Sequence, residues 1–153
     1  MKSIYIAGPT VFKPDAEKIY KTWSSMVREC GFEPLCPIDN QHTDPSDISF
    51  WNKEMIKACD YVIAEITPFR GPSCDVGTAF EIGYAEALGK PVILWSKARS
   101  EYCNRVEEDG MMIEDFGLED NLMITSESCV FGNFYSALIA LIALIKLESN
   151  QRN

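Results

Sequence analysis

The sequence is poor in histidine and lacks the spacings from which most metal sites and phosphate-binding loops are recognised. It contains one histidine, His42, in a polar segment that we interpret as a solvated loop. Sites with several histidine ligands are therefore excluded. Its six cysteines form no C-x-x-C pair, and no G-x-G-x-x-G segment is present, which argues against structural zinc and against a dinucleotide-binding loop. We expect no metal and no organic cofactor.

Positive charge is also scarce. The 153 residues carry 14 Lys and Arg against 23 Asp and Glu, a net charge of −9, and the sequence pI is about 4.6. A surface of this sign repels phosphate backbones, so we expect no binding to nucleic acid. A neutral small-molecule substrate fits this charge better than a polyanion does.

Long apolar runs are missing as well. No stretch of 18 apolar residues occurs, so we expect no membrane span. The first residues, MKSIY, lead directly into a strand-like segment and lack the pattern of a signal peptide. Without a secretory signal, the cysteines are expected to be reduced thiols, which favours a cytoplasmic location. The length suits one domain over residues 1–153.

What the sequence does contain is an alternation of short apolar segments with segments of helical spacing. Continuous apolar strands separated by helices are typical of a parallel sheet with helices on both faces. We predict an α/β fold, a doubly wound, five-stranded, flavodoxin-like sheet of order 2-1-3-4-5. The predicted strands are 4–7, 32–35, 61–66, 91–95 and 122–125, and the predicted helices are 15–30, 49–58, 75–88 and 134–147.

In such a sheet, ligands bind beyond the carboxyl ends of the strands where the strand order reverses. That point lies between strands 4–7 and 61–66, so the loops after Ala7 and Ile66 border the expected site. Glu81 lies one to two turns into the helix that leaves this point, at the edge of its apolar face. From the pattern alone, Glu81 is either a solvated surface carboxylate or a site residue. Asp75 is either a plain N-cap or a site residue.

Four segments, taken together and in order, resemble the nucleoside 2-deoxyribosyltransferase family. Residues 75–85, DVGTAFEIGYA, are similar to the family's D-x-G-x-x-x-E-x-G-x-A signature. The other three are residues 4–9 (IYIAGP), 37–41 (PIDNQ) and 121–123 (NLM). Each segment is weak evidence alone, but the similarity extends from residue 4 to about residue 147.

The resemblance implies three catalytic residues. Glu81 matches the family's nucleophile, Tyr5 the tyrosine that orients it, and Asp75 an aspartate implicated in proton transfer to the leaving base. It also implies a homo-oligomer, at least a dimer, in which a neighbouring subunit donates two residues to each site. The substrate-binding residues that we expect are Gly8, Gln41, Asn52, Asp75 and Gly77, with Asn121 and Met123 from the neighbour.

The chain departs from the family's pattern in two places. Asn52 stands where some members have a second aspartate, and an amide cannot donate a proton as a carboxylic acid does. The polar C-terminal tail has no match to the terminal carboxylate that reaches the site in some members. The sequence therefore leaves open whether purine or pyrimidine bases are preferred, and how Asn52 affects that preference.

The implied activity is transfer of the 2-deoxyribosyl group of a 2′-deoxynucleoside to a free nucleobase. It proceeds through a covalent intermediate on Glu81, with hydrolysis as a side reaction. One alternative is a 2′-deoxynucleoside 5′-monophosphate N-glycosidase, for which Lys13 and Arg70 would have to bind the phosphate. The other is a non-enzymatic nucleotide-binding module, because fold alone does not establish catalysis.

Overall fold

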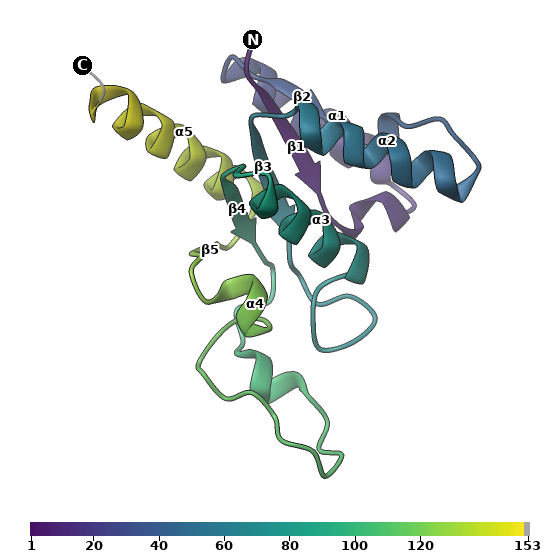
Figure 1. Ribbon diagram of the computed structural model, residues 1–153, viewed down its shortest axis with the longest axis vertical. Helices are drawn as coiled ribbons and strands as arrows, with labels where there is room; N and C mark the ends of the chain where they lie inside the picture. The colour runs from purple at the N-terminus through teal and green to yellow at the C-terminus, as the bar shows by residue number, and fades with distance from the viewer. Residues whose placement is uncertain (152–153) are drawn as a thin grey trace.

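Five parallel strands form the centre of the computed structural model, which describes residues 1–151 (Figure 1). Their order is β2-β1-β3-β4-β5, as the sequence predicts. The strands are β1 (Ser3–Ala7), β2 (Glu33–Leu35), β3 (Tyr61–Glu65), β4 (Val92–Trp95) and β5 (Val130–Phe131). The longer helices are α1 (Ala16–Glu29), α2 (Pro45–Ala58), α3 (Val76–Ala87) and α5 (Phe134–Gln151). The short ones are α4 (Leu122–Thr125), η1 (Pro9–Phe12), η2 (Pro37–Asp39) and η3 (Tyr102–Arg105).

Helices cover both faces of the sheet. Successive strand residues point to opposite faces, and β1 shows the division clearly. Ile4 and Ile6 join the core cluster formed with α1 and α5, whereas Tyr5 and Ala7 join the cluster formed with α2 and α3. The position of Tyr5 places its side chain on the same face as α3.

The fifth strand is not where the sequence analysis put it. Residues 122–125 form the short helix α4, and β5 follows at Val130–Phe131, where it pairs with β4. The side chain of Asn121 accepts a hydrogen bond of 3.0 Å from the backbone N–H of Met123 and so caps the helix. A run of three apolar residues and a threonine fits one helical turn as well as it fits a strand, and the cap decides between them.

The helices otherwise agree with their predicted positions, and their ends differ by a few residues. α2 begins at Pro45, earlier than predicted, because the Asp44 side chain accepts the Ser46 N–H and proline occupies the first turn. α5 continues to Gln151, beyond the predicted end at 147. Over residues 1–151, no helix has the length and apolar character required to cross a membrane.

A long connection joins β4 to α4. It leaves the sheet at the end toward which the strands point and projects away from the helices (Figure 1). Its residues 98–121 contain the single turn η3 and are otherwise irregular. The connection lies against the loop between β3 and α3, because Arg105 Nε donates a 2.8 Å hydrogen bond to the carbonyl of Pro72.

Candidate active site

The candidate site lies where β1 and β3, neighbours in the sheet, send their loops apart. Gly8 directly follows β1 with φ +149°, a conformation that side chains rarely adopt. A Cβ atom at this position would lie 2.7 Å from the Cβ of Glu65. Glycine is therefore needed for the loop to pass this close to the end of β3. Whether Gly8 also contacts substrate stays a prediction.

Glu65 is a buried carboxylate that the sequence analysis did not single out. It is 2% exposed at the end of β3, where its Oε2 accepts a 2.7 Å hydrogen bond from the Thr10 hydroxyl. The Lys13 ammonium lies 3.7 Å from the same oxygen and donates to Thr10 Oγ1. These contacts fasten the loop after β1 to β3, since a buried charge needs such partners. An acidic residue inside the apolar strand 61–66 was the signal available in the sequence.

The central pair of the site is Tyr5 with Glu81. The Tyr5 hydroxyl donates a 2.7 Å hydrogen bond to Oε1 of Glu81. Tyr5 reaches α3 from the middle of β1, and Glu81 lies in the second turn of α3. This contact joins residues 76 positions apart in the chain, so the structure brings these two predicted catalytic residues together and rejects the solvated reading of Glu81.

The environment of Glu81 favours its neutral form. The pKa of the carboxyl is raised from its ordinary 4.5 to about 7, because burial and, to a smaller extent, the Asp75 carboxylate outweigh the Tyr5 hydrogen bond, which lowers it. A carboxyl that titrates near neutral pH exists in both protonation states under ordinary conditions. Tyr5 in turn keeps its proton, because burial and the neighbouring Glu81 hold the pKa of its hydroxyl well above the usual value.

Glu81 opens onto a pocket of about 190 Å³ between α2 and α3. One of the predicted substrate-binding residues in this pocket is Asn52, whose Oδ1 accepts a 3.2 Å hydrogen bond from Asn40 Nδ2. Gly77 is another, and it keeps the start of α3 free of side chain at this point. The lining residues are Ser49, Asn52, Lys53, Ile56, Gly77, Phe80 and Glu81.

Asp75 caps α3, which is one of the two interpretations that the sequence allowed, a plain N-cap or a site residue. Its Oδ2 accepts hydrogen bonds from the N–H of Thr78 at 3.0 Å and from the Thr78 hydroxyl at 3.2 Å. A Cβ atom on Gly77 would lie 3.0 Å from the same oxygen. The cap and a site role are compatible, because the Asp75 carboxylate is only partly buried and lies near enough to Glu81 to raise its pKa.

Gln41 lies next to the Glu81 pocket rather than in it. With Asn40, His42 and Trp51, it lines an open pocket of about 370 Å³. The Asn40–Asn52 hydrogen bond connects this pocket with the one at Glu81. His42 is exposed, as predicted for a loop histidine, and its ring stacks on Trp51 with centroids 5.8 Å apart. The contact of Gln41 with a base remains a prediction.

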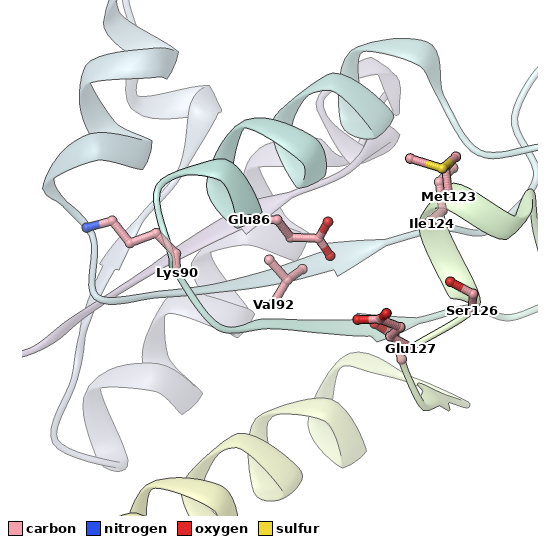
Figure 2. Close-up of a pocket in the computed structure, with 8 residues that line it drawn as sticks. Glu86, Lys90, Val92, Met123, Ile124, Ser126 and Glu127 are labelled. Carbon is pink, nitrogen blue, oxygen red and sulfur yellow. The ribbon is translucent and has the colours of Figure 1, made fainter.

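Asn121 and Met123 lie away from the Glu81 pocket of their own chain. Besides capping α4, Asn121 donates a 2.9 Å hydrogen bond from Nδ2 to Glu114. Met123 is 78% exposed and borders a different pocket, of about 530 Å³, which Glu86 also lines (Figure 2). Neither residue lines the Glu81 pocket within residues 1–151. Their predicted place in a neighbouring site is not tested by one chain.

Two aromatic rings join the loops on either side of the switch point. Phe12, after β1, stacks on Phe69, after β3, with centroids 5.4 Å apart. The Arg70 guanidinium lies 4.7 Å from the Phe69 ring centre and 5.4 Å from that of Phe12. Arg70 has φ +55°, a conformation uncommon for a residue with a side chain. The rings thus hold the arginine over the two loops.

A group of residues with metal-ligating atoms lies elsewhere. Glu101, Cys103 and Asp115 place such atoms within 4.8 Å of one another on the long connection. Two of the three are exposed, and exposed acidic groups of this kind are common in proteins that bind no metal. None of the three lines the Glu81 pocket, so this group has no part in the candidate site.

Comparison with known proteins decides the family. Residues 4–123 match the family model described as nucleoside 2-deoxyribosyltransferase. This chain belongs to the nucleoside 2-deoxyribosyltransferase family. The matched segment contains Tyr5, Asp75 and Glu81 as well as Asn121 and Met123, and it includes both loops of the switch point.

Two solved structures agree with this membership. A 2-deoxyribosyltransferase from Leishmania mexicana is 40% identical with a TM-score of 0.86, and the match covers 94% of this chain and 98% of that one. A 2-deoxyribosyltransferase from Bacillus psychrosaccharolyticus is 26% identical with a TM-score of 0.62, and the match covers 89% of this chain and 90% of that one. Both similarities extend well beyond the signature segment, so the whole fold is shared.

Two further matches are weaker in other respects, one in sequence identity and one in the share of the chains covered. A CMP N-glycosidase from Clostridium botulinum is 22% identical with a TM-score of 0.56, which is a likeness of fold alone. A protein from Schizosaccharomyces pombe described as uncharacterized is 30% identical over 99 residues, 58% of this chain. The matched segment spans 47% of that protein, less than half of its length.

Proposed function

We propose that this deoxyribosyltransferase-family chain transfers the 2-deoxyribosyl group of a 2′-deoxynucleoside to a free nucleobase, with Glu81 as the nucleophile. The observation that carries the proposal is the 2.7 Å hydrogen bond from Tyr5 to Glu81 at the edge of an open pocket. This bond fixes one carboxylate oxygen and leaves the other available for attack on a sugar.

The proposed reaction has two displacements. In the first, a Glu81 oxygen bonds to the anomeric carbon, the bond to the base breaks, and the base takes that electron pair and a proton from Asp75. In the second, a nitrogen of the acceptor base attacks the same carbon. The bond to Glu81 breaks, and the proton of the acceptor returns to Asp75. Two inversions give net retention, and water in place of the acceptor gives free deoxyribose.

The electrostatics of the site suit these roles. Glu81 must be ionised to attack, and its pKa of about 7 leaves a large fraction of carboxylate at neutral pH. The same carboxyl must also leave the sugar in the second step. A group of intermediate basicity serves both steps better than a strongly stabilised carboxylate does. No step requires a metal ion or an organic cofactor.

A phosphate-binding site would require cationic groups that the loop after β1 does not offer. The turn η1 has the sequence PTVF. Lys13, just beyond it, is occupied by Thr10 and Glu65, and Arg70 is held by two aromatic rings. The proposed substrate is therefore the neutral nucleoside rather than its 5′-monophosphate.

A second copy of the chain completes the site in this proposal by supplying Asn121 and Met123. Support comes from apolar side chains beside the Glu81 pocket that one chain leaves uncovered. Val76 is 86% exposed and Phe80 is 55% exposed, although both belong to α3. A mixing experiment tests this point. Glu81→Ala and Asn121→Ala subunits, each inactive alone, should regain activity when mixed, because some sites then receive both intact residues.

The reaction is tested by incubation with deoxyinosine plus adenine, and separately with thymidine plus adenine, followed by chromatography. Deoxyadenosine is the expected product from at least one donor. Glu81→Ala should abolish deoxyadenosine formation without loss of the fold. Glu86→Ala changes a carboxylate on the same helix but outside the Glu81 pocket, and it should leave deoxyadenosine formation intact. Near-normal transfer by Glu81→Ala would refute the assignment of Glu81 as the nucleophile. Free sugar alone would indicate a hydrolase instead.

A further inference from the structure

A fully buried carboxylate on the long connection contacts the loop that ends in Asp75. Asp120 is 0% exposed. Its Oδ2 accepts a 2.8 Å hydrogen bond from the backbone N–H of Cys74, and its Oδ1 accepts one from the Ser73 hydroxyl. The same Oδ1 accepts the Asn121 N–H at 2.7 Å. Both oxygens are thus engaged, and two of the three bonds go to residues directly before Asp75.

Arg105 holds the same loop from a second point. Its Nε donates to the carbonyl of Pro72 at 2.8 Å, and its two terminal nitrogens donate to the carbonyls of Ser100 and Glu119 within the connection. A guanidinium fixed at three backbone oxygens is held rigidly, since its donors form a planar fork. Arg105 and Asp120, which we call the clamp, therefore attach residues 72–74 to the connection.

Besides the clamp, the loop is held at its start, where Thr67 Oγ1 accepts the Lys97 N–H at 3.0 Å and Phe69 stacks on Phe12. The loop runs from Thr67 to Cys74 without regular secondary structure, and one internal backbone bond closes it, from the Phe69 N–H to the Ser73 carbonyl at 3.0 Å. Asp75 follows at once as the cap of α3. A shift of Cys74 therefore changes where the Asp75 carboxylate lies.

We propose that Arg105 and Asp120 are positioning residues that hold Asp75 where it delivers a proton to the departing base. This inference rests on the proposed function and adds two residues that neither the signature segment nor the Glu81 pocket contains. The clamp touches no substrate and acts through Asp75. Its loss should slow the departure of bases that need a proton, and it should spare a base that needs none.

The experiment compares two donors with adenine as the acceptor. The base of 2′-deoxyguanosine needs a proton to leave as a neutral molecule. The base of N7-methyl-2′-deoxyguanosine is already cationic and leaves as a neutral molecule without one. Asp120→Asn should lower kcat about tenfold with the first donor and less than threefold with the second, since proton transfer contributes about 100-fold or more. Asp75→Asn should show the same pattern more strongly.

Controls separate this role from a loss of fold. Asp60→Asn removes a carboxylate that accepts the Ser3 N–H at 2.8 Å at the start of β1, the opposite end of the sheet from the site. This variant should affect the melting temperature, and it should change kcat by the same factor with both donors. Arg105→Ala repeats the test should Asp120→Asn not fold. Its matched control is Arg99→Ala, which removes an exposed arginine from the same connection, where it pairs with Glu119.

Three outcomes would overturn the inference. Equal slowing of both donors by Asp120→Asn and Arg105→Ala would mean that the clamp is structural only, and no slowing of either donor would mean that it is dispensable. If Asp75→Asn slowed both donors equally, Asp75 would not be the proton donor, and the inference would fail. The proposal of transfer through Glu81 would still stand. The proposed transfer activity itself fails if the unaltered chain produces no deoxyadenosine from any donor, a result that none of these variants can produce.

Discussion

The Tyr5 hydroxyl donates a 2.7 Å hydrogen bond to Oε1 of Glu81 and thereby connects the middle of β1 to the second turn of α3. Burial alone favours the neutral carboxyl, and this bond favours the carboxylate. The balance leaves Glu81 with a pKa of about 7. Tyr5 therefore sets the reactivity of the proposed nucleophile as well as its direction.

Tyr5→Phe should shift the pH dependence of transfer. The substitution keeps the buried ring and removes the bond that lowers the pKa of Glu81, so ionisation of Glu81 should move to higher pH. A hydrogen bond to the ionised carboxylate is stronger than one to the neutral carboxyl by about 1 kcal/mol, which corresponds to a shift of roughly 0.5 to 1 pH unit. We expect kcat/KM to fall more at pH 6 than at pH 8. The measurement is a pH–rate profile from pH 5 to pH 9.

A control for this profile is Tyr61→Phe. The Tyr61 hydroxyl accepts a 2.6 Å hydrogen bond from Lys2 at the start of β3, away from the site. Its loss should leave the pH–rate profile unchanged. If Tyr5→Phe lowered the rate by the same factor at every pH, the bond would not be acting on the ionisation of Glu81.

The raised pKa of Glu81 also makes stability depend on pH. Between its ordinary value of 4.5 and about 7, the folded chain holds a proton that the unfolded chain releases. The stabilisation that Glu81 contributes to the free energy of unfolding is therefore fully present below pH 4.5, and it is lost as the pH rises to about 7. The loss is of the order of 3 kcal/mol.

Glu81→Gln removes this titration and should isolate its effect. Urea unfolding at pH 4.5 and pH 8 gives the free energy of unfolding of both proteins. From pH 4.5 to pH 8, we expect the free energy of unfolding of the variant to rise by about 2 to 3 kcal/mol relative to that of the original chain. A difference that stays constant with pH would show that the carboxyl titrates normally in the folded state.

Gly8→Ala should destabilise the loop after β1. The new Cβ would approach the Cβ of Glu65 to 2.7 Å, and φ +149° is strained for alanine. We expect a loss of about 1 to 3 kcal/mol in the free energy of unfolding together with reduced transfer. The matched control is Gly83→Ala in the interior of α3, where nothing lies within 4 Å of the new Cβ.

Because alanine favours a helix by about 0.5 to 1 kcal/mol over glycine, Gly83→Ala should raise the melting temperature. Thermal unfolding of the two variants, side by side, makes the comparison. A Gly8→Ala protein as stable as the original would mean that the loop can move away from β3 without cost.

The strand order could be predicted from the sequence because it rests on strong local patterns, whereas the roles of Tyr5 and Glu81 came from the resemblance to the family. Apolar strands at 4–7 and 61–66 fix the switch point, and the spacing within residues 75–85 places Asp75 and Glu81 in one helix. The prediction of a strand at 122–125 is wrong because the cap by Asn121 outweighs a run of three apolar residues. Such short segments carry too little periodicity to decide.

The clamp and the partners of the buried Glu65 could not be predicted, for a different reason. Both depend on contacts between residues far apart in the sequence, such as Asp120 with Cys74 and Glu65 with Thr10. An acidic residue in an irregular segment reads as solvated until the fold supplies its partners. The sequence identifies which residue types are present, and only the packing shows which carboxylates are enclosed.

The clamp holds its loop largely by main-chain atoms, the carbonyl of Pro72 and the N–H of Cys74. Every amino acid offers the same carbonyl, and every one except proline offers the same N–H. Side chains between Thr67 and Cys74 that make no such contact, unlike Ser73 and Phe69, can therefore change while the path of the loop stays the same. Homologous enzymes with this attachment can be expected to vary at these positions, just ahead of α3, without rebuilding the scaffold.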